Sequence, residues 1–382
     1  MVNSMTKENL NPNALPVVGI IGGGQLGKML AQVAKRMGHR VIILDPTPEC
    51  PAAQVSDEQL VAPYTDTEAL KTLNEKADVI TFEFENMPVD LLESHLDPER
   101  FVQGTKALAI SQDRLAEKAF LRECGLKTAP YAKIESFEDL KEALEGMGYP
   151  AVLKTTRFGY DGKGQIVLES EADLKATKPL IDEQTCILEG FVPFEAEASV
   201  MVARNPQGEM TTLPIGENRH VNNILHASLV PAALPEATQD KMIQEAKTLC
   251  EALDYVGILG IEYFVCQDEV LVNEIAPRPH NSGHYSIEAC DFSQFNLHMR
   301  GVLNLPLPED VQLLKPAVMV NILGQHLAAC RKLENDPAFV RAQFHDYGKA
   351  EARVDRKMGH ITELGADPEK LYQKFTATKI WD

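Results

Sequence analysis

The sequence has little of what marks several broad classes of protein. No apolar run approaches the length of about 20 residues that a membrane-spanning helix needs. Positive charge is in deficit, with 37 Lys and Arg against 56 Asp and Glu and a formal net charge of -19. Because phosphate backbones and anionic lipids need a basic face, this balance argues against a nucleic-acid- or membrane-binding protein. It is compatible with a small anionic substrate, which needs only a local basic pocket.

Paired cysteines and a signal-peptide core are also missing. The seven cysteines have no C-x-x-C spacing and their number is odd, which favours reduced thiols in a cytoplasmic protein over disulfides or a zinc site. The first sixteen residues, MVNSMTKENLNPNALP, are polar throughout most of their length. We expect residues 1–16 to form a mobile N-terminal extension.

The chain, at 382 residues, is longer than one compact core usually holds, so we expect several domains. Residues 17–21, a glycine turn, a helical pattern and residues 41–44 follow one another as strand, turn, helix and strand. This order predicts a Rossmann-like parallel sheet over residues 17–113. Ligands of such sheets bind at the carboxyl ends of the strands. The polar residues expected at that edge are Gln25, Asp45, Glu83, Glu85 and Asn86.

The glycine turn matches the dinucleotide fingerprint G-x-G-x-x-G at Gly22, Gly24 and Gly27, with an acid at Asp45. One interpretation is a nucleotide phosphate bound at the helix N-terminus. The other is tight packing of strand against helix, which needs glycine and nothing else. We favour the second over NAD binding, because the rest of the chain does not look like a dehydrogenase and Pro46 restricts how the acid could reach a ribose.

Two further patterns follow along the chain. A small α+β domain is predicted over residues 114–188, with short strands around a helix at residues 171–176. From residue 189 the strands lengthen and the turns become rich in Pro and Gly, which predicts a large antiparallel domain over residues 189–382.

The segment KTTRFGYDGKGQ, residues 154–165, joins two strand-like runs of the small domain. Its glycines would let backbone N–H groups approach phosphate oxygens, and Lys154 and Lys163 would supply charge. The alternative is an exposed hairpin tip, where Gly, Asp and Lys are common. Composition alone does not decide between the two.

Two acids in the large domain predict a metal site. Glu262 and Glu274 stand twelve positions apart on strands joined by a turn near residues 267–268, so a hairpin can place them side by side. Converging carboxylates repel each other unless a cation neutralises them. Mg²⁺ suits such a pair, because it takes carboxylate oxygens and completes its coordination with ATP phosphates. Apolar neighbours disfavour the alternative of two solvated acids.

Anion-binding side chains then cluster in PRPHNSGHYSIEA, with Arg278, His280, Asn281, Ser282 and His284. One of the two histidines is expected to be structural. Late in the chain, YGKAEARVDRKMGH adds further cations. Such a run is usually a solvated basic face. In so acidic a chain, however, it also predicts part of a substrate-anion site.

Taken together, these motifs resemble the ATP-grasp superfamily, and within it the family of N5-carboxyaminoimidazole ribonucleotide synthetases. The motifs that carry the resemblance are GIIGGGQLGKML, FEFEN, GYDGKGQ, NEIAPRPHNSGHYSIEAC and RKMGH, in that order between residues 17 and 364. The resemblance implies a Rossmann-like sheet, a small lid domain and a large antiparallel domain. It implies ATP-dependent carboxylation of 5-aminoimidazole ribonucleotide by bicarbonate through carboxyphosphate, in purine biosynthesis, with Mg²⁺ or else Mn²⁺ as cofactor. It also implies a cytoplasmic homodimer that passes a labile product to the next enzyme.

The resemblance assigns roles to individual residues. Those implied for ATP are Arg114, Lys154, Gly159, Tyr160, Asp161, Gly162, Lys163, Gly164, Gln165, Glu189, Gly190, Phe191, Val192, Glu197, His220, Asn273 and Glu274. Those implied for catalysis are Tyr160, Asp161 (which would take the proton of the amine), Lys163, Arg278, His280 and Asn281. Those implied for the ribonucleotide are Gln25, Glu85, Asn86, Arg278, His280, Asn281, Ser282, Lys349, Arg356 and Lys357. The family often has glycine where this chain has Phe158, which predicts a stiffer base for the lid loop.

Three other functions stay open at this point. A formate-using ribonucleotide transformylase would share the fold and the metal pair but require formate. A dehydrogenase would oxidise or reduce a nicotinamide cofactor without Mg²⁺. A regulatory protein would bind ATP without turning it over, and its binding would survive Asp161→Asn.

Overall fold

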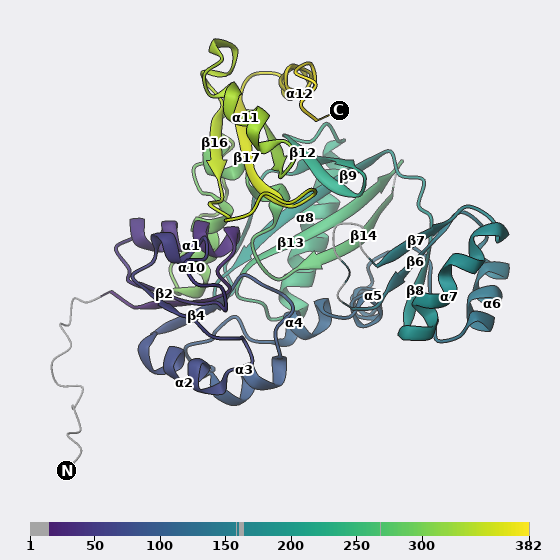
Figure 1. Cartoon of the computed structure of the whole chain (residues 1–382), viewed down its shortest axis with the longest axis horizontal. Coiled ribbons are helices and arrows are strands. Elements are labelled where there is room, and N and C mark those ends of the chain that lie inside the picture. The colour runs from purple at the N-terminus through teal and green to yellow at the C-terminus, as the bar shows by residue number, and fades with distance from the viewer. Residues whose placement is uncertain (1–14, 158, 160–163, 268, 382) are drawn as a thin grey trace. The chain divides into compact units, whose positions relative to one another are not determined.

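The architecture comes from a computed structural model that describes residues 15–157, 159, 164–267 and 269–381. Most of the expected N-terminal extension lies outside these residues. Contacts within the chain define two compact units, one of Met1–Glu83 with Asp90–Val102 and the other of Phe84–Val89 with Gln103–Asp382. Each unit has sheets of its own (Figure 1). None of the helices in the described ranges is long and apolar enough to cross a membrane.

The first unit is built on a four-stranded parallel sheet in the order β3-β2-β1-β4. The strands are β1 (Val18–Ile21), β2 (Val41–Leu44), β3 (Glu58–Leu60) and β4 (Val79–Phe82). The helices are α1 (Gln25–Arg36), α2 (Thr67–Lys76) and α3 (Val89–His95), of which α3 begins at the last residue of a segment grouped with the second unit. The predicted strand, turn, helix and strand at the start of this unit are confirmed.

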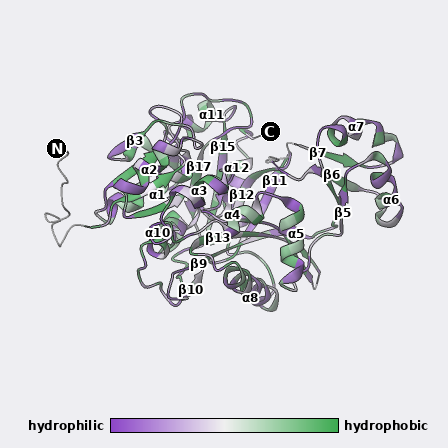
Figure 2. Ribbon diagram, turned by 90° about the horizontal axis from the view of Figure 1, so that it is seen from below, coloured by the Kyte–Doolittle hydropathy of each residue, from purple (hydrophilic) through white to green (hydrophobic). Residues whose placement is uncertain are grey.

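The second unit contains a small antiparallel sheet in the order β5-β8-β6-β7. Its strands are β5 (Tyr131–Ile134), β6 (Ala151–Thr155), β7 (Gln165–Leu168) and β8 (Cys186–Gly190). Helices α6 (Phe137–Met147) and α7 (Leu174–Glu183) bury leucine and isoleucine side chains in a shared core with the strands. Both helices carry hydrophilic and hydrophobic stretches, as expected of helices with one exposed side (Figure 2).

The same unit contains a nine-stranded sheet, in the order β14-β13-β9-β11-β12-β15-β17-β16 with β10 beside β9. Its strands are β9 (Ala196–Arg204), β10 (Met210–Thr212), β11 (Gly216–Val221), β12 (Ile224–Val230), β13 (Gly257–Cys266), β14 (Glu269–Ala276), β15 (Ala317–Leu323), β16 (Gln343–Asp346) and β17 (Lys357–Leu364). The helices are α4 (Lys106–Ser111), α5 (Arg114–Glu123), α8 (Glu236–Ala252), α9 (Ser286–Ala289), α10 (Gln294–Val302), α11 (Leu327–Leu333) and α12 (Pro368–Thr376).

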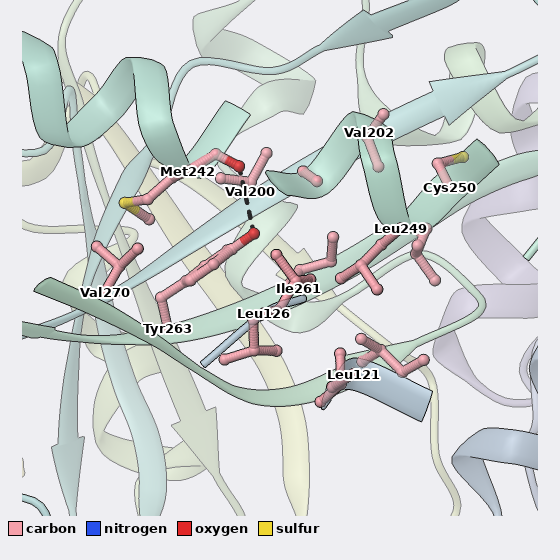
Figure 3. Packing of buried hydrophobic residues seen from close by; sticks show 14 of the residues in the cluster. Leu121, Leu126, Val200, Val202, Met242, Leu249, Cys250, Ile261, Tyr263 and Val270 are labelled. Carbon is pink, nitrogen blue, oxygen red and sulfur yellow. Dashed lines mark hydrogen bonds between the residues drawn. The ribbon is translucent and has the colours of Figure 1, made fainter. Parts of the chain in front are cut away.

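Helices α5 and α8 pack on the β9–β13–β14 part of this sheet through a buried apolar cluster (Figure 3). Tyr263 is the large side chain at its centre, and its hydroxyl donates to the Met242 carbonyl at 3.2 Å. Leu121 of α5 and Leu249 of α8 lie in the same cluster. This packing holds α5 against the two strands that carry Glu262 and Glu274.

Three predicted boundaries differ from the structure. The helix expected over residues 171–176 is a 3₁₀ turn at Glu171–Asp173 followed by α7, which continues to Glu183 despite a proline inside it. The proposed boundary between residues 188 and 189 falls within β8. Glu85 and Asn86, expected in the first domain, group with the second unit by their contacts. Among these contacts, the Gln112 amide donates to the carbonyls of Glu85 and Met87 at 2.6 and 2.7 Å.

Candidate active site

The hairpin of β13 and β14 brings Glu262 and Glu274 into direct register. A bulge follows Glu262, so the two acids form the last pair before the register shifts. Oxygen atoms of both and a ring nitrogen of His280 all lie within 4.8 Å of one another. The hairpin spacing predicted this convergence correctly.

The electrostatics of the pair are those of a candidate cation site. Burial, and then the charge of Glu274, raise the pKa of the Glu262 carboxyl, while His220 opposes the shift. Arg114 Nη1 lies 3.8 Å from Glu274 Oε2, too far for a strong hydrogen bond. Two carboxylates in a half-buried position fit Mg²⁺, whose preferred ligands are oxygens. The ring of His280 fits it less well.

His280 is held by neighbours that orient it toward Glu262. Its backbone N–H donates to Gln294 Oε1 at 2.9 Å, and its carbonyl accepts from Gln294 Nε2 at 2.8 Å. Its Nδ1 lies 2.8 Å from the Ser282 hydroxyl, which also bonds to Ser199. Burial, followed by the charge of Arg278, lowers the pKa of His280 well below its usual range. The ring is therefore a neutral hydrogen-bonding group.

Ser282 and Asn281 are more enclosed than the sequence suggested for substrate-binding residues. Ser282 is fully buried. Asn281 exchanges two amide hydrogen bonds with Asn321, at 3.0 and 2.6 Å. These bonds fix the turn after β14, so that Arg278 and His280 project from a rigid segment. Neither Asn321 nor Gln294 could be recognised from the sequence, because both act through contacts distant along the chain.

The remaining cations expected to bind the ribonucleotide have partners of several kinds. Arg278 Nε lies 3.0 Å from Glu85 Oε1. Lys349 Nζ donates to the Lys357 carbonyl at 2.7 Å, which ties its loop to β17. Arg356 is exposed and donates to a backbone carbonyl. Lys357 is close enough to shift the pKa values of groups at the carboxylate pair.

The base of the glycine loop is joined to α5. The Arg114 guanidinium donates to the Gly159 carbonyl at 3.3 Å, and Arg157 Nε pairs with the Asp113 carboxylate at 3.1 Å. Gln165 begins β7 and pairs with Lys154 of β6. The other loop residues to which the sequence assigns roles lie outside the described residues: Tyr160, Asp161, Gly162 and Lys163.

A buried ionic cluster lies where β8 meets α5. Glu189 accepts from Lys154 of β6 and lies 3.1 Å from Lys118 Nζ of α5. Burial opposes ionisation of Glu189, but the two lysines outweigh it and lower its pKa to about 2. Beyond Glu189, Gly190 ends β8, Phe191 is exposed and Val192 is buried.

Helix α5 holds two residues that sequence reasoning missed, Glu117 and Lys118. Glu117 is buried and accepts from the Ile275 N–H at 2.7 Å, and burial raises its pKa to about 7. Both residues stand three or four positions after Arg114, on the face that carries Leu121 into the core. Two charged residues on the buried face of an amphipathic helix were the available signal.

Glu197 and His220, expected near the ribose, lie on neighbouring strands with Glu197 Oε2 2.6 Å from His220 Nδ1. Burial disfavours the protonated ring, but hydrogen bonding to Glu197 and the charge of Glu197 raise the pKa of His220 overall. Glu197 and His220 therefore form an ion pair, and both are close enough to Glu262 to influence its pKa.

In the first unit, protein carboxylates bind the N–H groups of the glycine turn. Gly23 N–H donates to Asp45 Oδ2 and Gly24 N–H donates to Glu83 Oε1, each at 2.7 Å. A dinucleotide pyrophosphate would meet these two negative charges instead of free donors. The structure thus supports the packing interpretation of the fingerprint. Gln25 is the first residue of α1.

Comparison with known proteins agrees with this geometry. Three family models match successive parts of the chain: the ribonucleotide synthetase preATP-grasp domain at residues 15–112, the ATP-grasp domain at residues 119–295 and the phosphoribosylaminoimidazole carboxylase C-terminal domain at residues 317–374. The N5-carboxyaminoimidazole ribonucleotide synthase of Bacillus subtilis is 45% identical over 374 residues, which cover 97% of each chain. The chain belongs to the N5-carboxyaminoimidazole ribonucleotide synthase family.

Other members of the N5-carboxyaminoimidazole ribonucleotide synthase family are similar over nearly the same length. The Staphylococcus aureus (strain COL) enzyme is 41% identical over 364 residues, covering 94% of this chain and 96% of its own. An ADP complex of N5-carboxyaminoimidazole ribonucleotide synthetase superposes with a TM-score of 0.92 at 46% identity, covering 97% of each chain. The Aspergillus clavatus synthase in complex with ADP and 5-aminoimidazole ribonucleotide gives 0.86 at 30% identity, covering 94% of this chain and 96% of its own. The ATP-grasp fold and the family expected from the sequence are confirmed.

Proposed function

We propose that this chain couples ATP cleavage to carboxylation of 5-aminoimidazole ribonucleotide by bicarbonate, with carboxyphosphate as intermediate and Mg²⁺ as cofactor. Family membership gives the overall activity, an ATP-dependent ligase that forms N5-carboxyaminoimidazole ribonucleotide in purine biosynthesis. The observation that carries the finer proposal is the register pairing of Glu262 with Glu274. This pair provides the charge that a phosphate-bound cation requires.

The nucleotide is proposed to lie between the small sheet and β14. Lys154 and Arg114 would neutralise its phosphates, since phosphoryl transfer depends mainly on positioning and charge. Glu189 and Val192 would meet the adenine edge, and Glu197 would accept from the ribose hydroxyls. Mg²⁺ on the carboxylate pair would neutralise the charge that develops on the transferred phosphoryl group.

The second half of the site is proposed to hold carboxyphosphate and the ribonucleotide. Arg278 and the neutral His280 would donate to the carboxyphosphate oxygens, and the cations of the late basic segment, including Lys357, would bind the ribonucleotide phosphate. Carboxyphosphate is readily lost to water, so the glycine loop is proposed to close over it. Asp161 would accept the proton that the exocyclic amine loses as its bond to the carboxyl carbon forms.

The oligomeric state and the cellular compartment are proposed from the resemblance to the family. We propose a cytoplasmic homodimer that passes its labile product to the next enzyme of the pathway. Sedimentation analysis of the purified protein would give its oligomeric state, and a monomer at working concentration would contradict the dimer. Addition of the next enzyme should raise the yield of the later product above that of sequential incubation.

The deciding experiment measures ADP release from Mg·ATP, with and without 5-aminoimidazole ribonucleotide, in bicarbonate-depleted and bicarbonate-replete buffer. We expect release that requires the ribonucleotide, with bicarbonate raising the yield of carboxylated product. Formate replaces bicarbonate in a parallel reaction. Formate-dependent turnover would overturn the proposal in favour of the transformylase, and folded protein with no stimulation by the ribonucleotide would overturn both.

A further inference from the structure

Lys118 is a charged residue in one of the most enclosed positions of the second unit, with 2% of its side chain exposed. Its ammonium group donates to the Asn273 carbonyl at 2.5 Å and lies 3.1 Å from Glu189 Oε1. It therefore connects β14, the strand that carries Glu274, with β8, the strand whose Glu189 is proposed to contact the adenine edge. One side chain thus joins the large sheet to the small sheet.

Glu189 is shared between Lys118 and Lys154, and only 6% of its side chain is exposed. The lysines differ in enclosure, since 19% of the Lys154 side chain is exposed against 2% for Lys118. Lys118 also has a second anchor in the Asn273 carbonyl. Lys154 is thus the lysine that can turn toward another partner, and Lys118 is the lysine that stays.

The proposed role of Lys154 requires such a turn. A triphosphate carries more negative charge than a single carboxylate, so it would compete for the Lys154 ammonium. If Lys154 were the only partner of Glu189, its departure would leave a buried carboxylate uncompensated, which is strongly unfavourable. Lys118 removes that obstacle, because it continues to neutralise Glu189.

Building on the proposed function, we infer that Lys118 is the permanent counter-ion of Glu189, which frees Lys154 to bind the ATP phosphates and keeps Glu189 a charged acceptor for the adenine amine. Lys118 is then a positioning residue and not a catalytic one. An ionised carboxylate accepts a hydrogen bond from the exocyclic amine of adenine and repels the carbonyl oxygen that guanine carries at the same place. Lys118 therefore also supports the choice of ATP over GTP.

The test compares Lys118→Met and Lys118→Arg in the full chain, with KM for ATP, kcat and the ratio of kcat/KM values for ATP and GTP as readouts. Lys118→Met should raise KM for ATP about tenfold or more and lower the ATP/GTP ratio to a similar extent. Lys118→Arg keeps the charge and should recover most of both losses. Lys127→Met is the matched control, because Lys127 also pairs with a glutamate, Glu269, but both are about half exposed; it should change neither value.

A double variant keeps the test decisive if Lys118→Met folds poorly. Glu189→Gln removes the charge that Lys118 neutralises, so adding Lys118→Met to Glu189→Gln should raise KM for ATP little further. Additive losses would overturn the inference, as would a Lys118→Met protein with a lowered melting temperature but an unchanged KM and ATP/GTP ratio.

Lys154→Met distinguishes failure of the proposed nucleotide site from failure of the inference about Lys118. If it leaves KM for ATP unchanged, the proposed nucleotide site fails; if it raises KM while Lys118→Met does not, only the inference about Lys118 fails.

Discussion

Two glycine-rich segments of this chain resemble each other in sequence and differ in what surrounds them. The turn at residues 22–27 follows β1, which is buried throughout, and the loop at residues 159–164 follows β6, in which buried and partly buried residues alternate. In the first, carboxylates of Asp45 and Glu83 accept the backbone N–H groups. The described base of the second is bordered by cations, among them Lys154 and Arg114.

The difference shows what a glycine pattern does and does not determine. Glycine permits a close approach of the backbone to some acceptor. Whether that acceptor is a side chain of the protein or the phosphate of a ligand depends on the charged side chains that the fold places around the backbone. In the first unit these are acids, so the turn serves packing. In the second unit they are lysine and arginine, which leaves a role for an external anion.

The largest effect should follow from a change at the carboxylate pair of Glu262 and Glu274, which is proposed to bind Mg²⁺. Glu274→Gln keeps the shape but removes one of two charges that a Mg²⁺ ion needs. We expect kcat/KM for ATP to fall on the order of 10²- to 10³-fold, measured by ADP release in the presence of the ribonucleotide. Glu269→Gln, an exposed residue at the start of the same strand, is the control and should change kcat/KM less than twofold. A Glu274→Gln enzyme with more than a tenth of the original activity would exclude the metal role.

A change at the glycine turn of residues 22–27 should instead lower the stability of the protein and leave ATP binding unchanged. The Asp45 carboxylate accepts from Gly23 N–H and Tyr64 hydroxyl at 2.7 Å and from Thr47 N–H at 2.8 Å. Asp45→Ala leaves these donors without an acceptor, so we expect a loss of about 3 kcal/mol in the free energy of unfolding of the first unit. KM for ATP should stay within twofold.

Urea unfolding measures this loss, with Glu68→Ala as control because its side chain is 80% exposed. That control should stay within about 0.5 kcal/mol of the unchanged protein. If Asp45→Ala instead raised KM for ATP severalfold without loss of stability, the glycine turn would be a nucleotide site after all.

The ionic cluster around Glu189 should make the stability of the protein depend on pH. The two lysines lower the pKa of Glu189 from 4.5 to about 2, so the unfolded chain binds the proton more readily than the folded chain. The stabilisation is fully present above pH 4.5 and is lost as the pH falls from 4.5 toward 2, and it amounts to on the order of 3 kcal/mol. Melting temperatures between pH 6 and pH 3 should therefore fall less steeply for Glu189→Gln than for the unchanged protein. Parallel curves would show that the cluster contributes nothing to acid sensitivity.

The smallest effect concerns Gly164, the last glycine of the glycine loop. Gly164 has a φ of +72°, and an added Cβ would lie 2.9 Å from the Thr155 hydroxyl. Gly164→Ala should cost about 1 kcal/mol and raise KM for ATP two- to fivefold, because it distorts the β6–β7 connection. Gly208→Ala is a matched control, with a φ of +85° and no atom within 4 Å of the added Cβ. It should show similar strain in thermal unfolding and no change in KM.

The sequence predicted those parts of the fold and site that rest on local pattern. The βαβ start, the hairpin that pairs Glu262 with Glu274 and the short strands of the small sheet all follow from periodicity and spacing. Contacts between distant segments were out of reach, since nothing local shows that Gln112 ties Glu85 to the second unit or that Gln294 fixes His280. Lys118 was missed although it lies on the apolar face of an amphipathic helix, because a lysine at such a position usually keeps its ammonium group in water. Its position on that face was a signal, but its partners Glu189 and Asn273 are known only from the fold.

Helix α5 has a consequence for how far this site can be altered. Through Arg114, Glu117 and Lys118 it contacts the base of the glycine loop, the strand of Glu274 and the strand of Glu189. An α-helix turns about 100° per residue. Insertion of a single residue after Arg114 would therefore swing the guanidinium away from the other two side chains and disturb all three contacts together. Changes of length in this chain are better tolerated in its surface loops than anywhere along this one short helix.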